Sequence, residues 1–278
     1  MRKVNEATII SIAFAINDDY VDQLGVTILS ILLSNPAHTF DFIVFSSDIS
    51  DGGIKKLKNI HKDSKKYQLR FIKVDDSLFN GFPVRIRHIT RETYYRYLLP
   101  DLLPNQDRVL YLDADLLVLG DIAELWNLDI EQHFVAGSNK EYISIQFPGY
   151  KQSLGLDEDE TYVNAGVLLF NLELIRKHDK VRMLFENTER LKDIIKIQDQ
   201  DVINITFKGA IKSFSNKYNY TTRDRLEKSR SNKDVVIVHF NTSNKPWEKD
   251  YKQTEDDTYF VELYKEYQCR YQIISMDV

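Results

Sequence analysis

Runs rich in isoleucine, valine and phenylalanine alternate with amphipathic stretches through the first half of the chain. The predicted strands are residues 9–16, 40–45, 68–74 and 109–112, and the predicted helices are residues 20–33, 53–59 and 90–99. Strands that are apolar on both faces and alternate with helices are typical of a parallel sheet covered on both sides. We therefore expect an α/β protein with a Rossmann-like, mostly parallel central sheet flanked by helices.

The second half is less regular but continues the same pattern. Its predicted strands are residues 134–137, 167–170, 211–214 and 235–240, and its predicted helices are residues 172–178, 181–193 and 199–206. Residues 248–278 are rich in tyrosine and predict a helical tail that packs on the protein rather than a membrane-binding foot. Because no linker-like composition interrupts the chain, residues 1–278 are predicted to form one domain.

Charge and cysteine content exclude several classes. Lys and Arg number 37 against 42 Asp and Glu, a net charge of −5. Nucleic-acid binders normally present a basic face, so no nucleic-acid partner is expected. A single cysteine, Cys269, excludes an internal disulfide and a thiolate zinc site. Without a signal peptide or a bilayer-spanning run, the expected location is the cytoplasm, with at most peripheral contact with the inner face of the membrane.

The most informative local feature is Asp113-Ala114-Asp115, which lies between two apolar runs. Side chains at i and i+2 of an extended segment point the same way, so the two carboxylates would repel each other unless a cation lay between them. Oxygen ligands of this kind suit Mg²⁺ or Mn²⁺, and ligands of open α/β sheets bind at the carboxyl ends of strands. A solvated acidic turn is the alternative. A phosphotransferase of the haloacid-dehalogenase type is disfavoured, because the pair lies in mid-chain.

A second informative stretch follows the strand at residues 235–240. It ends on His239, and Lys245 and Trp247 come after a short turn. An imidazole could be a third metal ligand, and a lysine offers a point charge to a phosphate. Taken alone, a histidine such as His239 is more often a core residue with satisfied hydrogen bonds than a ligand. Together with the carboxylate pair it indicates a site for a metal and a diphosphate.

Six segments in order give the chain a resemblance to a known family. They are residues 12–20 (IAFAINDDY), 81–90 (GFPVRIRHIT), 109–115 (VLYLDAD), 162–171 (YVNAGVLLFN), 198–201 (QDQD) and 239–247 (HFNTSNKPW). Together they resemble glycosyltransferase family 8, the retaining enzymes of GT-A fold, and most of all the bacterial lipooligosaccharide α-galactosyltransferases. The resemblance runs from about Ile9 to Trp247.

The resemblance implies a role for each matching residue. The residues implied to contact a UDP-sugar donor are Ala15, Asn17, Tyr20, Arg96, Asp113, Ala114, Asp115, Asn164, Ala165, Gly166, Asp199, Gln200 and Lys245. Asp113, Asp115 and His239 would hold Mn²⁺, or Mg²⁺ in its place, against the diphosphate. Lys245 would help to neutralise the leaving group, and Asp199 and Gln200 are the other catalytic candidates. His88 and Thr242 would lie on the acceptor side.

Three departures from the family pattern bear on the choice of sugar. Asn17 stands where the family usually has aspartate, and Thr242 stands where it usually has glycine. The galactosyltransferases also place an aspartate after the strand that ends near Gly137, where this chain has Asn139-Lys140-Glu141. The metal ligands are intact.

The sequence therefore predicts a retaining, metal-dependent transferase. It would move galactose or glucose from the UDP-sugar to a glycan, glycolipid or glycoprotein acceptor. A covalent glycosyl-enzyme and a same-face departure and attack are both open. Asn17 and Thr242 also prompt the alternative of a nucleotide-sugar-binding protein with little or no turnover. A sugar nucleotidyltransferase is disfavoured, because residues 17–20 are not a glycine-rich phosphate loop.

Overall fold

The computed structural model describes residues 9–60, 65–86, 88–140, 142–226, 232–252 and 258–276. Its main sheet has seven strands in the order β3-β2-β1-β4-β7-β6-β8. These strands are β1 (Ile9–Ala15), β2 (Thr39–Ser46), β3 (Tyr67–Lys73), β4 (Arg108–Leu112), β6 (Val135–Asn139), β7 (Val163–Asn171) and β8 (Ile211–Phe214). The expected mostly parallel α/β sheet is confirmed.

One strand departs from the parallel pattern. β7 pairs antiparallel with both β4 and β6, whereas the other neighbouring pairs are parallel. It is also longer than the predicted residues 167–170, because it begins at Val163. All but the last of its nine residues are buried. The strand therefore lacks the alternation of apolar and polar residues that would have indicated an antiparallel strand. As a result, Asn164 and Gly166 at its start lie beside the end of β4.

A second sheet has three short strands, β5 (Leu116–Val118), β10 (Ile237–His239) and β9 (Tyr220–Thr221). β10 runs antiparallel to β5 and parallel to β9. β5 was not predicted separately, because the apolar run that follows Asp115 looks like a continuation of the strand before it. This sheet brings the last third of the chain onto the loop that joins β4 to β5.

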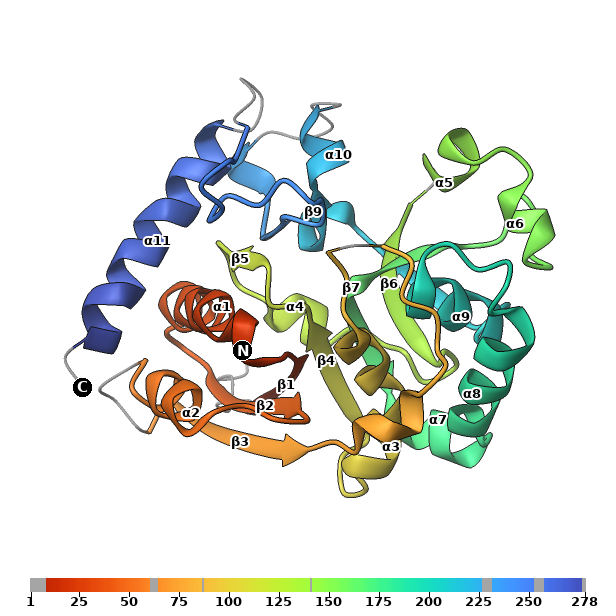
Figure 1. Ribbon diagram of the computed structural model, residues 1–278, viewed down its shortest axis with the longest axis horizontal. Coiled ribbons are helices and arrows are strands. Elements are labelled where there is room, and N and C mark those ends of the chain that lie inside the picture. The colour runs from red at the N-terminus through yellow and green to blue at the C-terminus, as the bar shows by residue number, and fades with distance from the viewer. Residues whose placement is uncertain are drawn as a thin grey trace, which may run out of the picture.

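Helices cover both faces of the main sheet (Figure 1). The α-helices are α1 (Val21–Ser34), α2 (Asp51–Lys58), α3 (Leu99–Leu102), α4 (Ala123–Trp126), α5 (Tyr142–Gln146), α6 (Tyr150–Ser153), α7 (Leu172–Lys177), α8 (Lys180–Leu191), α9 (Gln198–Thr206), α10 (Thr222–Leu226) and α11 (Thr258–Met276). The 3₁₀ helices are Asp18–Tyr20, Asp76–Phe79, Arg91–Leu98, Asn216–Tyr218 and Asn232–Asp234. The two faces of the main sheet carry separate apolar cores, one beneath α1 and one beneath α8 and α9. β1 contributes to both, because Ile12 and Phe14 face α1 while Ala13 faces the other side.

The helix predicted over residues 90–99 is wrong in type and end. Residues Arg91–Leu98 form a 3₁₀ helix, and α3 continues from it with Pro100 in its first turn. In the first turn of a helix the backbone amides have no acceptor within the helix. A proline there therefore loses no hydrogen bond, and it starts the helix instead of ending one. The 3₁₀ geometry buries Arg96 together with Tyr94, Tyr95 and Tyr97.

Helix α1 also supports the loop that carries the carboxylate pair. Its hydroxyl groups at Thr27, Ser30 and Ser34 lie on one face and contact the edge of β5. The single hydroxyl proton of Thr27 is shared between the carbonyl oxygens of Ala114 (2.9 Å from Oγ1) and Leu116 (2.8 Å), and Ser30 Oγ accepts from the amide of Val118 at 2.9 Å. These bonds satisfy backbone groups at the edge of the sheet that a fourth strand would otherwise have to pair.

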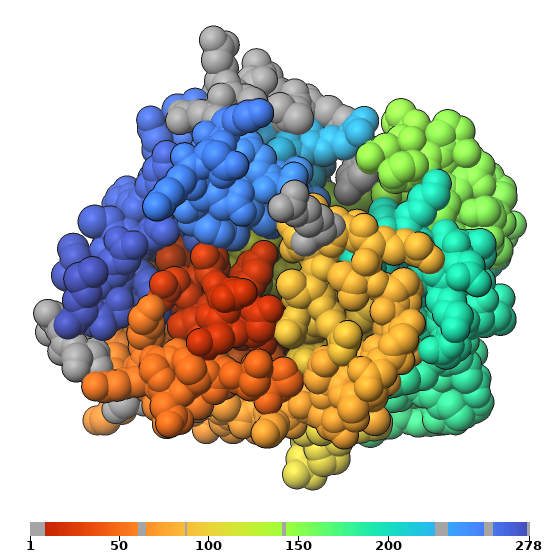
Figure 2. All heavy atoms as spheres, viewed as in Figure 1, coloured from red at the N-terminus to blue at the C-terminus, as the bar shows by residue number. Residues whose placement is uncertain are grey.

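The predicted C-terminal helical tail is present as α11 over Thr258–Met276, and residues 253–257 and 277–278 lie outside the described residues. It packs along α1, so the last described α-helix lies beside the first (Figure 2). Phe260, Tyr264 and Tyr271 of α11 are buried, as expected for a packed helix. Among the described helices, none is both long and apolar enough to cross a membrane.

The contact between α1 and α11 depends on Gly25. A Cβ atom added there would lie 2.6 Å from the hydroxyl oxygen of Tyr271 and closer still to its ring carbons. Alanine is favoured over glycine in a helix by about 1 kcal/mol, but overpacking a buried contact costs about 1–3 kcal/mol. We expect Gly25→Ala to lower the free energy of unfolding in urea by up to about 2 kcal/mol. Gly120→Ala is the control, since its Cβ would meet Val236 at an ordinary 3.4 Å; equal stability of both variants would contradict the prediction.

Candidate active site

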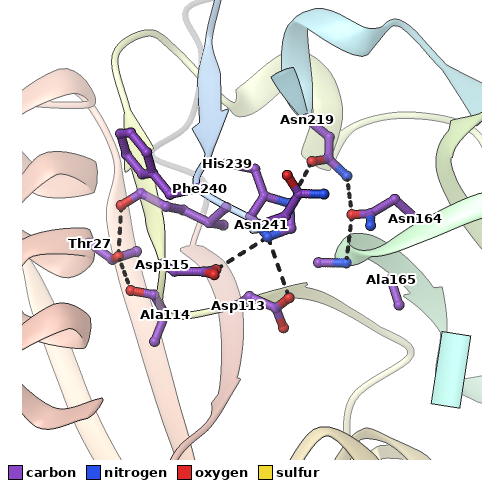
Figure 3. Close-up of polar contacts among 12 residues, drawn as sticks. Thr27, Asp113, Ala114, Asp115, Asn164, Ala165, Asn219, His239, Phe240 and Asn241 are labelled. Atoms are coloured by element: carbon purple, nitrogen blue, oxygen red, sulfur yellow. Dashed lines mark hydrogen bonds and ion pairs between the residues drawn. The ribbon is translucent and has the colours of Figure 1, made fainter. Parts of the chain in front are cut away.

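Two carboxylates and one imidazole converge where the two sheets meet. Asp113 and Asp115 lie between β4 and β5, and His239 ends β10, opposite Leu116 of β5. Nε2 of His239 is 3.2 Å from Oδ1 of Asp115 and 3.7 Å from Oδ2 of Asp113 (Figure 3). One ligand atom from each residue lies within 4.8 Å of the others. The predicted metal ligands are therefore brought together, and the two aspartates face the same way.

A chain of hydrogen bonds leads from the backbone of β7 toward this imidazole. The amide of Ala165 donates to Oε1 of Gln200 at 3.1 Å, which identifies that atom as the acceptor. Nδ2 of Asn164 donates to the same oxygen at 2.9 Å, so Oδ1 of Asn164 is left as an acceptor. It accepts from the amide of Gly166 at 3.1 Å. Two backbone amides thus fix the orientation of both side-chain amides.

The chain continues through Asn219, which is fully buried. Nδ2 of Asn219 donates to Oδ1 of Asn164 at 2.8 Å, so its Oδ1 faces Nδ1 of His239 at 2.9 Å (Figure 3). An oxygen acceptor there requires a proton on Nδ1, so a neutral imidazole keeps its lone pair on Nε2. That lone pair faces two carboxylates, an arrangement that a cation stabilises. Oδ1 of Asp115 is buried without a hydrogen-bond partner among the described residues, as expected for a metal ligand.

Gly166 leaves room for this cluster. Its carbonyl oxygen accepts from the amide of Asp113 at 2.9 Å, which holds the start of β7 against the end of β4. A Cβ atom at residue 166 would lie 2.7 Å from Oδ2 of Asp113 and closer still to Cε1 of His239. Any side chain would therefore occupy the space between the proposed ligands.

Arg96 organises the carboxylates on the other side of the site. Its guanidinium is buried, lies 4.1 Å from the centre of the Tyr111 ring, and donates to the carbonyl oxygen of Ala165. It pairs with Asp113 at 3.0 Å and with Asp199 at 3.2 Å. Burial raises the pKa of Asp199 to about 6, although Arg96 opposes the rise and Asp113 adds to it.

Lys245 contacts Asp115, the second carboxylate of the metal-site pair. Its Nζ donates to Oδ2 of Asp115 at 2.6 Å and to the carbonyl oxygen of Phe240 at 2.7 Å. Burial opposes ionisation of Asp115, but Lys245 and His239 together outweigh it and hold the pKa of that carboxyl well below its ordinary value. An ammonium has three donors, so one remains for a further anion beside the metal ligands.

Asn17 and Tyr20 lie beyond the end of β1. Oδ1 of Asn17 is buried and has no hydrogen-bond partner among the described residues. The Tyr20 ring packs edge-on against Trp247, with ring centres 6.4 Å apart. An unpartnered acceptor next to an aromatic ring suits a planar ligand that carries an N–H donor.

One cavity of about 630 Å³ joins all of these groups. Every residue that the sequence predicted for the donor, the metal and the acceptor lines it, including His88 and Thr242. Burial lowers the pKa of His88, and the nearby Lys245 charge adds to that effect. By contrast, Asp201 does not line the cavity: it accepts from the hydroxyls of Tyr150 and Tyr162.

The sequence model of "Glycosyl transferase family 8" matches residues 11–251, most of the chain. The chain belongs to glycosyltransferase family 8. Among solved structures, the galactosyltransferase LgtC in complex with donor and acceptor sugar analogues aligns with a TM-score of 0.84 and 30% identity, covering 94% of this chain and 95% of that one. This likeness confirms the GT-A fold that the sequence predicted.

Two curated relatives act on lipopolysaccharide by name. The lipopolysaccharide 1,3-galactosyltransferase of Salmonella typhimurium is 27% identical over 263 residues, covering 87% of this chain and 74% of its own length. The lipopolysaccharide 1,2-glucosyltransferase of Escherichia coli K12 is 26% identical over 265 residues, covering 90% of this chain and 76% of its own.

The family 8 motifs did not reveal every group at the site. Sequence reasoning missed Asn219, which lies in an irregular segment without a recognisable pattern. It also missed the far lining of the cavity, formed by Ile143, Gln146 and Phe147 of the segment after β6, by Lys196 and Ile197, and by Thr222 and Arg223 of α10. The position of each of these residues depends on how a loop folds back over the sheet, which the family motifs do not describe.

The departure after β6 has a structural role in this family 8 chain. Asn139 Oδ1 accepts from the amide of Tyr162 at 3.0 Å. Lys140 is buried, and its Nζ pairs with Asp224 at 2.8 Å and donates to the carbonyl oxygen of Asn219 at 3.0 Å. Glu141 lies outside the described residues. Lys140 therefore holds the segment that carries Asn219 instead of lining the cavity.

We expect Gly166→Ala to weaken Mn²⁺ binding by at least about 100-fold, because the added methyl group separates His239 from Asp113. Free Mn²⁺ measured by electron paramagnetic resonance would report this. The control is Gly52→Ala on α2, whose Cβ would come no closer than 3.8 Å to another residue. Tight Mn²⁺ binding by a folded Gly166→Ala variant would contradict the assignment of the ligands.

We expect Asn219→Leu to weaken Mn²⁺ binding by about 10- to 100-fold, because His239 would lose the acceptor that fixes its tautomer. The same resonance measurement reports the affinity, and circular dichroism checks that the variant is folded. Unchanged affinity in a folded variant would show that the imidazole is oriented without this hydrogen bond.

Proposed function

We propose that the chain is a retaining hexosyltransferase that moves galactose or glucose from a UDP-sugar to a glycan, glycolipid or glycoprotein acceptor in a metal-dependent reaction. The observation that carries the proposal is the cluster at the wall of a cavity of about 630 Å³, where Nε2 of His239 lies 3.7 Å from Asp113 and 3.2 Å from Asp115. The two lipopolysaccharide relatives transfer glucose and galactose by name, which supports a hexose donor.

The ligand set supports Mn²⁺, with Mg²⁺ as the weaker substitute. Two carboxylates alone would suit Mg²⁺, but an imidazole ligand favours Mn²⁺. Asp113, Asp115 and His239 would hold the ion, and it would supply positive charge to the diphosphate as the bond to the sugar breaks. The residues that fit this role are oriented before any ligand arrives, because Asn219 and Arg96 already hold them.

The nucleotide end of the cavity supports a uracil base. The imide N–H of uracil would donate to the unpartnered Oδ1 of Asn17, and Tyr20 would stack on the base. Asparagine keeps the acceptor that an aspartate would offer, so this departure from the family pattern is compatible with uridine. It also weakens the case for a protein that no longer turns over its nucleotide sugar.

Lys245 and the Arg96–Asp199 pair would act at the two ends of the breaking bond. The remaining donor of Lys245 would bind the diphosphate, where negative charge grows in the transition state. Asp199 and Gln200, beside Asn164 and Ala165, would bind hydroxyl groups of the donor sugar. Because Oε1 of Gln200 already accepts from Asn164 and Ala165, its role includes holding the wall of the sugar site.

The charges in the cavity favour retention. Its described lining carries four carboxylates, those of Glu92, Asp113, Asp115 and Asp199. The two aspartates of the metal site and the Arg96-bound Asp199 are committed to other partners. An inverting enzyme needs a carboxylate base on the acceptor hydroxyl, and three of these four carboxylates are not available for that task.

A donor screen tests the proposal. Purified protein should release UDP over many turnovers from UDP-galactose or UDP-glucose with Mn²⁺, and excess chelator should abolish the release. Asp115→Asn should reduce turnover by at least about 1,000-fold, while Asp22→Asn, an exposed carboxylate paired with Lys56, should leave it unchanged.

The linkage formed from an α-linked donor should be α, as proton resonance of the anomeric position would report. A β-linked product would exclude retention. Tight binding of the UDP-sugar without multiple turnovers would instead support the nucleotide-sugar-binding alternative.

A further inference from the structure

Asp201 is a buried carboxylate that the proposed reaction does not use. It is fully buried and ends the segment QDQD (198–201), in which Asp199 and Gln200 line the cavity and Asp201 does not. Its oxygens accept four hydrogen bonds, from the hydroxyls of Tyr150 and Tyr162 and from two backbone amides. A carboxylate offers about four acceptor positions, and donors of the protein itself occupy as many here.

The two amides belong to the turn that leads into α9. Oδ2 of Asp201 accepts from the amides of Lys196 at 2.9 Å and Ile197 at 2.7 Å, and the Asp201 amide donates back to the carbonyl oxygen of Ile197 at 3.3 Å. Within this turn Gln198 has a φ of 41°, in the left-handed region that residues other than glycine rarely adopt. Such a conformation persists only where surrounding contacts enforce it, and Asp201 supplies those contacts.

The turn also sets the direction of the two residues that follow it. Asp199 pairs with Arg96 at 3.2 Å, and Oε1 of Gln200 accepts from the amide of Ala165 at 3.1 Å. A different backbone angle at Gln198 would turn the start of α9, and both side chains with it. The shape of the turn therefore determines how Asp199 and Gln200 face the cavity.

The hydroxyl of Tyr162 gives Asp201 a second connection to Gln200. It donates to Oδ1 of Asp201 and accepts from Nε2 of Gln200 at 3.2 Å. Because a carboxylate only accepts, the hydroxyl proton points to Asp201 and the phenol oxygen is left to accept from the amide. Asp201 thus fixes the side-chain amide of Gln200 as well as the backbone before it.

We propose that Asp201 is a positioning residue, which holds Asp199 and Gln200 in the orientation that binds the donor sugar. The inference rests on the proposed function, since it concerns the sugar end of the same site. Asp201 would act through these two residues and not on the sugar itself.

The nucleotide end of the site should not depend on Asp201. UDP would be bound by other groups, among them Asn17, Tyr20 and the metal. The hydrogen-bond chain that orients His239 has its own anchor in the amide of Gly166, which donates to Asn164. Loss of the Asp201 carboxylate should therefore weaken binding of the sugar and spare binding of UDP.

The test measures the affinities for a UDP-sugar and for UDP separately. UDP-galactose, UDP-glucose and UDP are each titrated by calorimetry into the protein with Mn²⁺ and without an acceptor. For the UDP-sugar that turns over, we expect Asp201→Asn to weaken binding about tenfold, while the affinity for UDP changes by less than about twofold. Turnover should fall but remain measurable. A variant that is only less stable would, once folded, bind both ligands as before.

Two results would overturn the inference. If the affinities for the UDP-sugar and for UDP change by the same factor, or neither changes, Asp201 does not position the sugar-binding residues. If binding is unchanged and turnover is abolished, Asp201 acts on the sugar directly.

Asp41→Asn is the matched control. Asp41 is another buried carboxylate, and it accepts from Arg70 and Gln106 on the β2 side of the sheet. Its loss should leave the ratio of the two affinities unchanged.

Tyr162→Phe tests the same inference if Asp201→Asn does not fold. It removes the hydroxyl between Asp201 and Gln200 and should raise the dissociation constant for the UDP-sugar about threefold relative to that for UDP. An unchanged ratio in this variant would contradict the inference. Because UDP release by the unaltered protein is measured separately, failure here leaves the proposed transferase function standing.

Discussion

The site depends on one lone pair, that of Nε2 in His239. It is directed at Asp113 and Asp115 because Asn219 accepts the proton on the other ring nitrogen, and Asn219 is oriented in turn by Asn164. The orientation originates in two backbone amides of β7, which cannot be reversed as a side-chain amide can. The antiparallel strand β7 thereby determines which ring nitrogen carries the proton in a histidine that belongs to the other sheet.

The rest of the fold supports this arrangement from three directions. Helix α1 binds the loop between β4 and β5 through Thr27, Arg96 binds the carboxylates from the 3₁₀ helix, and Lys140 binds the segment of Asn219 from β6. Each support is buried and charged or polar, and each is satisfied by backbone or ionic partners. Lys140 shows that a residue which departs from the family pattern can support the ligand cavity instead of lining it.

Sequence patterns predicted the helices, strands and motifs that depend only on neighbouring residues. The apolar strands at the start of the chain, the helices between them and the spacing of Asp113 and Asp115 follow from neighbouring residues. The direction of β7 could not be predicted, because a strand buried on both faces has no period to reveal it. Asn219 and the lining formed by Phe147 and Lys196 depend on contacts between distant segments, which composition and periodicity do not encode.

The pairing of β10 with β5 makes the metal site a late product of folding. Asp115 and His239 are separated by more than a hundred residues, so the ligands meet only after the last third of the chain has docked. A cation that binds the docked state alone shifts the folding equilibrium toward it by mass action. The ion would then hold two distant parts of the chain together. The stability of the contact between β5 and β10 would vary with the concentration of free metal in the cell.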